Sequence, residues 1–382
     1  MKVNSQRKLG PLLLATMWAA TATGAHADWV IGQVAPMTGA AAVQSKAYAQ
    51  GMQLYFNQIN RTGGVQGERV RLVSADDRGN PDDTVKQTQR LLQESKPVAL
   101  AGYFGNRNLQ ALLDSKLLDK AQISVVGFQS TDPQVLKAAQ LFSTRAVLMD
   151  EIEKISKHLA TLGLTRLALV YDVRQANEAQ ALEALVAEVM ATAGATLLVS
   201  SMLQPGKAAQ EATVDRLQNK ELNVQAVIVV ASSPITSAFV EAYRLDGGAA
   251  QIYATSSADI EQLATRLPPD LMRGVSIAQV VPNPYRANNR LSKEFRDLVG
   301  QQTKGEALPV SYAMMEGYVN AKVLVEAMRR TQPLSSEKLA DSMRSLNALD
   351  LGGYWLSFRQ GTQVGSKFVD LSIVNAQGRV IQ

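Results

Sequence analysis

The stretch from Trp29 to Asp77 constrains the fold most, because its pattern predicts a complete strand–helix–strand unit. An apolar run, Val30 to Ala35, is followed by a loop of small residues and then by apolar side chains at spacings of three and four. Asn60 to Gly64 ends this predicted helix, since glycine adopts the left-handed cap conformation readily. A second strand, Val70 to Ser74, follows. Strand, helix and strand in this order predict a βαβ crossover.

The alternation of strands and helices continues as far as residue 255. Short apolar segments with short connections favour parallel strands covered by helices on both faces. These segments are residues 98–102, 123–127, 167–171, 196–202, 226–231 and 252–255. We therefore predict two successive α/β units of similar size. After Gly274 the pattern changes to one strand, three helices and two final strand-like segments, 352–358 and 368–374, which we expect in a hairpin-like layout.

The first 27 residues differ from the rest of the chain. Lys2, Arg7 and Lys8 form a basic start, and the apolar run from Leu9 to Ala22 is short for a membrane span. Ala25-His26-Ala27 is a small-x-small cleavage site. We interpret residues 1–27 as a cleaved secretory signal peptide and expect a periplasmic protein.

Charge and cysteine content exclude several function classes. The signal peptide holds three of the 39 basic residues and none of the 34 acidic ones, so the remaining chain has a net charge of +2. This charge is too small to indicate nucleic acid binding. The chain has no cysteine, which excludes a lipid-modified cysteine at the cleavage site, a disulfide and a thiolate metal site.

The sequence of the first unit resembles one family of proteins. Pro36-Met37-Thr38-Gly39, Gln58-Ile59-Asn60, Gly63 to Gly67 and Leu72 to Asp77 occur in this order. These pieces resemble the amino acid-type solute-binding proteins of ABC transporters, in the leucine/isoleucine/valine-binding branch. The resemblance covers essentially the whole chain after the signal peptide. It implies the type I periplasmic binding fold, with two Rossmann-like lobes, each a parallel sheet flanked by helices.

The resemblance also implies how the chain is divided. In this family the chain crosses between the lobes three times, which we place near Thr144, Val281 and Leu349. Lobe one is then expected to contain residues 28–144 plus 282–349. Lobe two is expected to contain residues 145–281 plus 350–382.

Motifs for catalysis or metal binding are not found in the sequence. The chain after the signal peptide has a single histidine, His158, without a nucleophile motif beside it. Asp76-Asp77 and Asp82-Asp83 are typical of a strand-end turn and a helix N-cap rather than a cation site. We therefore expect no enzyme activity, no cofactor and no metal.

Ligand binding is the remaining class of function. In open α/β sheets the ligand crevice lies beyond the carboxyl ends of the strands, so the loops after the strands are candidates. Polar side chains there also cap helices routinely, so the hypothesis depends on several loops converging. The candidate ligand-binding residues are Thr38, Gln44, Phe104, Asn106, Arg107, Gln129, Ser130, Thr131, Tyr171, Ser233 and Ser256.

The resemblance gives some of these residues a role. In amino acid-binding members, residues at the places of Asn106 and Thr131 hold the ligand carboxylate, and the backbone carbonyl at the place of Gln129 takes the ammonium. Aromatic positions of the family become Gln44, Ala176 and Ser233 here. The acidic residue that pairs the ligand ammonium becomes Ser256.

These differences from the family change the class of ligand that we expect. Loss of the acid removes a charge-assisted hydrogen bond of about 1.5–3 kcal/mol. We hypothesise that the ligand is not an ordinary branched-chain amino acid but a carboxylate, an amide or an aromatic acid, with Arg107 as a possible anion partner. Calorimetric titration tests this, and sub-micromolar binding of leucine or valine would contradict it.

The leading functional hypothesis is a monomeric periplasmic protein that captures a small molecule between its lobes and delivers it to an ABC permease of the inner membrane. One alternative is a ligand-sensing receptor subunit for a signalling partner, without transport. A secreted enzyme on a two-lobed scaffold and a member that binds no small molecule are further alternatives. No nucleic acid partner is expected.

Overall fold

The computed structural model describes Met1 and residues 28–39, 41–172, 176–204, 207–302, 309–358, 362–375 and 380–381. Apart from Met1, the predicted signal peptide of residues 1–27 lies outside the described residues. No helix in the described part of the chain is both long enough and apolar enough to cross a membrane.

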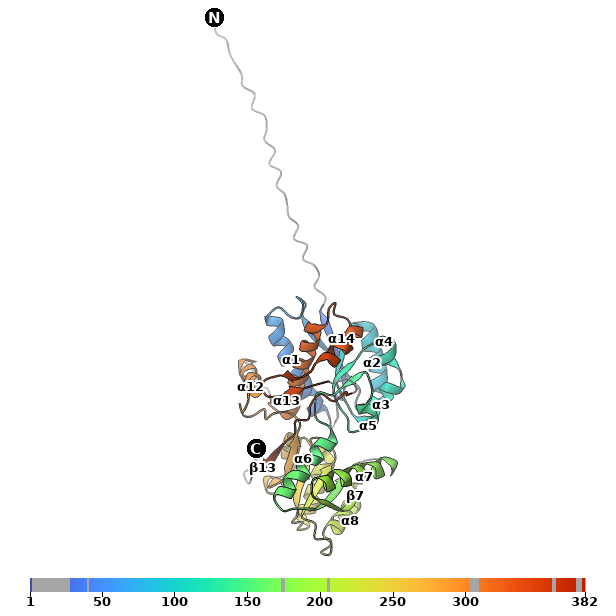
Figure 1. Ribbon diagram of the computed structural model, residues 1–382, viewed down its shortest axis with the longest axis vertical. Coiled ribbons are helices and arrows are strands. Elements are labelled where there is room, and N and C mark those ends of the chain that lie inside the picture. Colours follow the sequence, from blue (N-terminus) through green and yellow to red (C-terminus); the bar gives the residue numbers. More distant parts are fainter. Residues whose placement is uncertain are drawn as a thin grey trace.

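The described chain forms two lobes, as the sequence predicts, one above the other in Figure 1. The first lobe contains a five-stranded sheet in the order β2-β1-β3-β4-β5, and all of its neighbouring strands are parallel. Its strands are β1 (Trp29–Ala35), β2 (Val70–Asp76), β3 (Ala99–Phe104), β4 (Val125–Gln129) and β5 (Leu141–Phe142). The predicted βαβ unit is confirmed, because β1 pairs with β2 along its whole length, from Trp29 opposite Val70 to Ala35 opposite Asp76.

Helices cover both faces of the first sheet. The helices that follow its strands are α1 (Ala42–Arg61), α2 (Pro81–Ser95), α3 (Asn106–Asp114), α4 (Leu117–Ala121) and α5 (Pro133–Leu136). Successive side chains of β3 enter opposite cores, with Ala99 and Ala101 in one and Leu100 in the other. Residues that alternate in this way and are all apolar require cover on both sides, which explains the uninterrupted apolar runs in the sequence.

Three later helices return to the first lobe, where Figure 1 shows them beside the earlier ones. They are α12 (Arg290–Gln302), α13 (Tyr312–Arg330) and α14 (Ser336–Ser345). Helix α13 packs closely on α1 because each helix presents a glycine to the backbone of the other. A Cβ atom on Gly51 would lie 1.9 Å from the carbonyl oxygen of Met314, and one on Gly317 would lie 1.9 Å from that of Tyr48.

The second lobe contains a seven-stranded sheet in the order β14-β13-β10-β9-β8-β6-β7. Its strands are β6 (Arg166–Tyr171), β7 (Thr196–Met202), β8 (Ala226–Val230), β9 (Gln251–Ala254), β10 (Ser276–Gln279), β13 (Asp370–Val374) and β14 (Val380–Ile381). The helices are α6 (Leu148–Thr161), α7 (Ala176–Thr192), α8 (Lys207–Leu217), α9 (Ser233–Leu245), α10 (Ile260–Arg266) and α11 (Pro269–Met272). The sheet is mostly parallel, with β13 and β14 added antiparallel at one edge.

The expected hairpin between the last two strand-like segments is wrong. Strand β12 (Trp355–Leu356) instead pairs with β11 (Leu349–Asp350), while β13 pairs with β10 and β14. The side chain of Asp350 accepts hydrogen bonds from the N–H groups of Gly352 and Gly353 at 2.8 and 2.7 Å. Both glycines have positive φ angles, of 107° and 94°. A tight local turn therefore closes the hairpin before the chain reaches β13.

Tyr354 contacts segments that follow strands of both sheets. Its side chain is fully buried, and its hydroxyl donates hydrogen bonds to the carbonyl oxygens of Thr144 at 2.7 Å and Val280 at 3.1 Å. Thr144 follows the last strand of the first sheet, and Val280 follows β10 of the second. One side chain thus connects the segment that follows β5 of the first sheet with the segment that follows β10 of the second.

Candidate functional site

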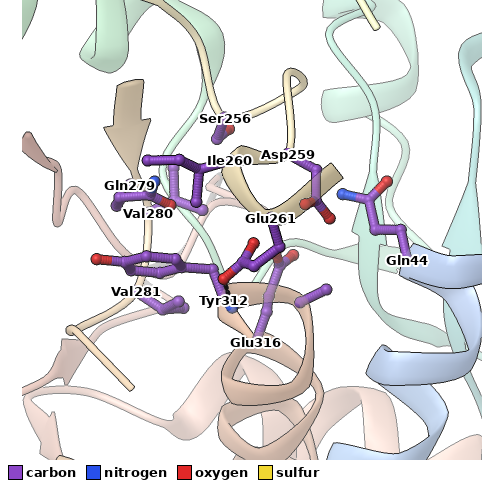
Figure 2. Close-up of a pocket in the computed structure, with 11 residues that line it drawn as sticks. Gln44, Ser256, Asp259, Ile260, Glu261, Gln279, Val280, Val281, Tyr312 and Glu316 are labelled. Carbon is purple, nitrogen blue, oxygen red and sulfur yellow. Dashed lines mark hydrogen bonds between the residues drawn. The ribbon is translucent and has the colours of Figure 1, made fainter. Parts of the chain in front are cut away.

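A small cavity lies between the two lobes, at the carboxyl ends of β9 and β10 (Figure 2). Its volume is about 20 Å³, which is room for about one water molecule. The first lobe contributes residues of α1 and α13, and the second contributes the loop after β9, the start of α10 and the end of β10. The lining residues are Gln44, Ser256, Asp259, Ile260, Glu261, Gln279, Val280, Val281, Tyr312, Ala313 and Glu316.

Helix ends position several of these side chains. Asp259 is the N-cap of α10, and its carboxylate accepts the N–H of Gln262 at 2.9 Å. On the other side, Ser311 caps α13 by accepting the N–H of Met314 at 3.1 Å. Tyr312 and Glu316 then lie one helical turn apart on the same face, so both reach the cavity.

A buried ion-pair network borders the cavity and joins the lobes. The guanidinium of Arg145 lies 3.4 Å from a carboxylate oxygen of Glu316 and 3.6 Å from one of Glu151, and all three side chains are buried or nearly so. Arg145 also donates a hydrogen bond to the hydroxyl of Ser256. The N–H and hydroxyl of Ser256 donate to Glu151 at 2.6 and 2.8 Å. Glu316 belongs to α13 of the first lobe and Glu151 to α6 of the second, so Arg145 bridges them.

Within this network, burial and the neighbouring charges shift the pKa of each group in opposite directions. Burial raises the pKa of both Glu151 and Glu316, and the Arg145 guanidinium acts in the opposite direction on each. Burial disfavours the guanidinium charge, but the two carboxylates outweigh it and raise the pKa of Arg145. Removal of one member is therefore expected to be destabilising, because it leaves a buried charge without its partner.

A second group of carboxyls lies at the start of α10. Glu261 accepts hydrogen bonds from the hydroxyl of Tyr285 and from the N–H of Tyr312, the latter at 2.9 Å. Burial is the main cause that raises the pKa of Glu261 to about 8, and the nearby charge of Asp259 adds to it. Glu261 therefore carries a proton at neutral pH, unlike an ordinary carboxyl group.

Two of the sequence-predicted residues, Gln44 and Ser256, line the cavity. A third, Gln129, contacts its wall, since its amide lies 3.4 Å from a carboxylate oxygen of Glu316. Phe104 is buried and packs edge-on against the ring of Tyr48 at 5.6 Å, which places it in the core beneath the site. The ligand-binding role of each of these residues stays a prediction.

Three other predicted residues form one cluster beyond the carboxyl ends of β3 and β4. The amide oxygen of Asn106 accepts hydrogen bonds from the Ser130 hydroxyl and the Thr131 N–H, both at 2.9 Å. The amide nitrogen of Asn106 donates to the Thr131 hydroxyl at 3.0 Å. Two loops that the sequence places after neighbouring strands are therefore joined, although neither lines the cavity.

The remaining predicted residues lie apart from the cavity lining. The hydroxyl of exposed Thr38 donates to Asp76 at 2.7 Å, and the side chain of Arg107 is exposed at the start of α3. Tyr171 is buried and donates to Glu183, and burial raises the pKa of its hydroxyl to about 12. The buried hydroxyl of Ser233 accepts the N–H of Asp259 at 3.2 Å and so supports the loop that carries Asp259.

Most of the charged groups around the cavity were missed by the sequence analysis. Asp259, Glu261 and Glu151 stand at helix starts, where acidic residues are common for reasons of helix stability alone. Two features of the sequence could have indicated charged residues at this site. Arg145 directly follows the predicted crossover at Thr144, and Glu316 is an isolated acid in the otherwise apolar first turns of α13.

The site has no features of a metal centre. Within the described ranges, no group of three or more histidine, cysteine, aspartate or glutamate residues is placed to hold a metal ion. The cavity instead combines carboxyl, amide and hydroxyl groups with the apolar side chains of Ile260, Val280 and Val281. Such a mixture suits an organic molecule with a few polar groups.

Comparison with known proteins places the chain among binding proteins. It is 37% identical over 113 residues to an amino acid binding protein of Pseudomonas aeruginosa, a stretch that covers 30% of each chain. It is 37% identical over 84 residues to Leu/Ile/Val-binding protein homolog 3 of Brucella melitensis, covering 21% of this chain and 23% of that one. The aligned stretches thus span less than a third of these curated relatives.

Solved structures match over almost the whole chain. A substrate-binding periplasmic protein from Ralstonia solanacearum is 30% identical, with a TM-score of 0.82 over 93% of this chain and 100% of that one. An extracellular ligand-binding receptor from Verminephrobacter eiseniae is 27% identical, with a TM-score of 0.85 over the same shares. The family model for periplasmic binding proteins matches residues 28–374. The resemblance seen in the sequence is confirmed: the chain belongs to the periplasmic binding protein family, whose members bind substrates and are not enzymes.

Proposed function

We propose that the protein is exported to the periplasm, captures a small amino acid-like molecule between its lobes, and delivers it to an ABC permease in the inner membrane. The observation that carries this proposal is the cavity whose walls come from both lobes, with Gln44 and Glu316 on one side and Ser256 and Asp259 on the other. A site shared in this way is complete only when the lobes are together. Ligand binding then favours the closed form.

The division of the chain supports a hinge between the lobes. We propose that residues 28–144 and the described residues from 282 to 365 belong to lobe one, and residues 145–281 and the chain after Gly365 to lobe two. We move the third crossover from Leu349 to the segment after Gly365. The reason is that Phe358 packs on Phe142 of β5 at 5.6 Å, and the Gly365 N–H donates to the Ser143 carbonyl at 2.9 Å.

Side chains at or beside the crossovers make contacts that we expect to change when the two lobes close. Arg145 stands directly after the first crossover and contacts Glu316 of one lobe and Ser256 of the other. Tyr354 holds the first two crossover segments through their carbonyl oxygens. In our proposal the lobes rotate about these segments, and the Arg145 contacts across the cleft form as the lobes close.

Binding is tested on the protein purified from the periplasm of an expressing bacterium. A thermal-shift screen against free amino acids, amino acid amides and small organic acids identifies stabilising compounds, and calorimetry then gives a 1:1 stoichiometry if the proposal is right. The absence of any stabilising compound in such a screen would count against ligand capture.

Transport is tested separately. A gene deletion in the source bacterium is expected to abolish high-affinity uptake of the radiolabelled ligand, and a plasmid copy is expected to restore it. Unchanged uptake would contradict delivery to a permease and would favour the alternative of a sensing subunit.

A further inference from the structure

The cavity between the lobes is surrounded by more carboxyl groups than cationic groups. Four carboxyls, those of Glu151, Asp259, Glu261 and Glu316, lie in or beside its wall, together with the Arg145 guanidinium. That guanidinium is already paired with Glu151 and Glu316. Among the described residues, no ion-pair partner reaches Asp259 or Glu261. The Asp259 carboxylate is therefore available to a ligand, and Glu261 becomes available as a charge when it releases its proton.

Two polar atoms in the cavity wall have no ordinary hydrogen-bond partner among the described residues. They are Nε2 of Gln279 and Oε2 of Glu261, and both atoms are buried; the protonated Glu261 carboxyl interacts there only with another acid, Asp259. The whole side chain of Gln279 is only 4% exposed. A buried polar atom without a partner is unfavourable by about 1–3 kcal/mol, and such atoms are uncommon in proteins. Their position in one cavity indicates that a bound molecule completes the hydrogen bonding.

We propose that Asp259 and Glu261 bind the cationic nitrogen of the ligand, while Gln279 donates a hydrogen bond to a neutral oxygen of the same molecule. This inference rests on the proposed function and adds the chemical class of the ligand. That class is amines that carry a carbonyl or hydroxyl oxygen, such as amino acid amides. Figure 2 shows Asp259 extending toward Gln44 of the first lobe, with Glu261 and Glu316 at the same space.

A ligand carboxylate fits this site less well than an ammonium. It would approach four carboxyl groups, and the Arg145 guanidinium is already paired with two of them, Glu151 and Glu316. Arg107, the anion partner considered from the sequence, is exposed and does not line the cavity. The structure therefore favours recognition through the amine, whereas the substitution at Ser256 had suggested a carboxylate, an amide or an aromatic acid.

An organic cation suits the site better than a metal ion. The described residues contain no cluster of three carboxyl or histidine groups arranged around one point. The cavity of about 20 Å³ accepts a group of the size of water or ammonium. The rest of the molecule needs further space between the lobes, so we expect the lobes to close around the ligand less tightly than in this structure.

Proton exchange is a further property of this site. Burial and the neighbouring Asp259 charge raise the pKa of Glu261 to about 8, while the Tyr285 hydroxyl and the Tyr312 N–H lower it through hydrogen bonds. Glu316 also faces the cavity. A cation bound beside Glu261 favours its ionised form, so binding near pH 7 releases a proton.

Matched ligands test the proposal. Leucine carries an ammonium and a carboxylate, leucinamide keeps only the ammonium, and N-acetylleucine keeps only the carboxylate. The same three forms are prepared for alanine, phenylalanine and asparagine. Calorimetry on the exported protein is expected to show that at least one amide binds as tightly as, or more tightly than, the free amino acid. The N-acetyl form, which lacks the cation, is expected to bind at least about tenfold more weakly.

Two conservative variants locate the contact. Asp259→Asn keeps an oxygen to cap α10, and Glu261→Gln keeps an acceptor for Tyr285 and Tyr312, so both are expected to fold. Each is expected to weaken binding of the amide about ten- to hundredfold. Asp270→Asn, at an exposed residue of α11 in the same lobe, is the control and is expected to leave binding unchanged. Circular dichroism and the melting temperature of each variant show that loss of binding is not loss of fold.

The outcomes separate this inference from the proposed function. Tight binding of an N-acetyl form or an organic acid, with no binding of the amides, would overturn the cationic site but keep ligand capture. Amide binding that Asp259→Asn and Glu261→Gln leave unchanged would also overturn it. A protein that binds none of the four sets overturns the inference, and if the wider screen is negative too, the proposed function falls with it.

Discussion

At the scale of single residues, Arg145 is the charged side chain on which the interior of the molecule depends most. It pairs with Glu316 and Glu151, whose side chains are 7% and 4% exposed. Arg145→Met removes the partner of both acids and keeps most of the volume. We expect it to lower the free energy of unfolding by about 3–5 kcal/mol in urea denaturation at pH 7.

The control for this prediction is an exposed ion pair. Arg90 and Glu94 are 68% and 60% exposed, so Arg90→Met is expected to change stability by less than about 1 kcal/mol. In addition, Arg145→Met combined with Glu316→Gln is expected to recover part of the loss, since one unpaired charge is removed. Equal effects of Arg145→Met and Arg90→Met would contradict a structural role of the buried network.

Glu261 gives a residue-scale prediction on pH. Its pKa in the folded protein is about 8, above the ordinary value of 4.5, so between these values the folded state holds a proton that the unfolded state has released. Its contribution to stability therefore falls as pH rises from about 4.5 to about 8. Glu261→Gln cannot ionise, so its melting temperature relative to the natural protein is expected to be higher at pH 8.5 than at pH 5, by about 3 °C or more. Melting curves whose difference is the same at both pH values would show that Glu261 is not held protonated.

At the scale of secondary-structure elements, the contact between α1 and α13 holds the late part of the chain on the first lobe. A Cβ atom on Gly317 would lie 1.9 Å from the Tyr48 carbonyl oxygen, so Gly317→Ala forces the helices apart. We expect a loss of about 1–3 kcal/mol or more, measured by urea denaturation.

A second glycine of the same lobe is the matched control. Gly300 lies in α12, and an added Cβ there meets no atom within 4 Å. Gly300→Ala is therefore expected to be neutral or to stabilise by up to about 1 kcal/mol, because alanine favours helix. If both alanine variants had the same effect, close packing of α1 on α13 would not be the cause.

Individual elements also show what the sequence could predict. Most strands of both sheets were visible as apolar runs, although β5 and β14, of two residues each, were not predicted. The helix ends at Gly63 and Gly163 were visible as glycines, which have positive φ angles of 99° and 73°. The hairpin of β11 and β12 was missed because it depends on the turn at Asp350. Its two strands are too short to give a recognisable sequence pattern. Local patterns specify elements, whereas pairing between short strands is decided by turns and tertiary contacts.

The candidate site could be predicted only in part, for a similar reason. Gln44 and Ser256 line the cavity, and the sheet rule had directed attention to the loops that carry them. Glu261 and Glu316 meet although they are far apart in the sequence, because the two lobes bring their helices together. No spacing in the sequence shows which helix of one lobe faces which loop of the other.

At the scale of the whole molecule, the central claim is that two lobes close around a ligand. The cavity is bounded by both lobes, the Arg145 network joins them, and Tyr354 ties the segments that connect them. A ligand that contacts both walls binds the closed form more tightly than the open form, and it must therefore shift the population toward the closed form.

Small-angle X-ray scattering of the exported protein, with and without a saturating ligand from the binding screen, tests this claim most directly. We predict a smaller radius of gyration with the ligand. The decrease is expected to disappear in Asp259→Asn combined with Glu261→Gln, at the same ligand concentration. An identical scattering curve with and without a ligand that calorimetry shows to be bound would contradict closure of the two lobes.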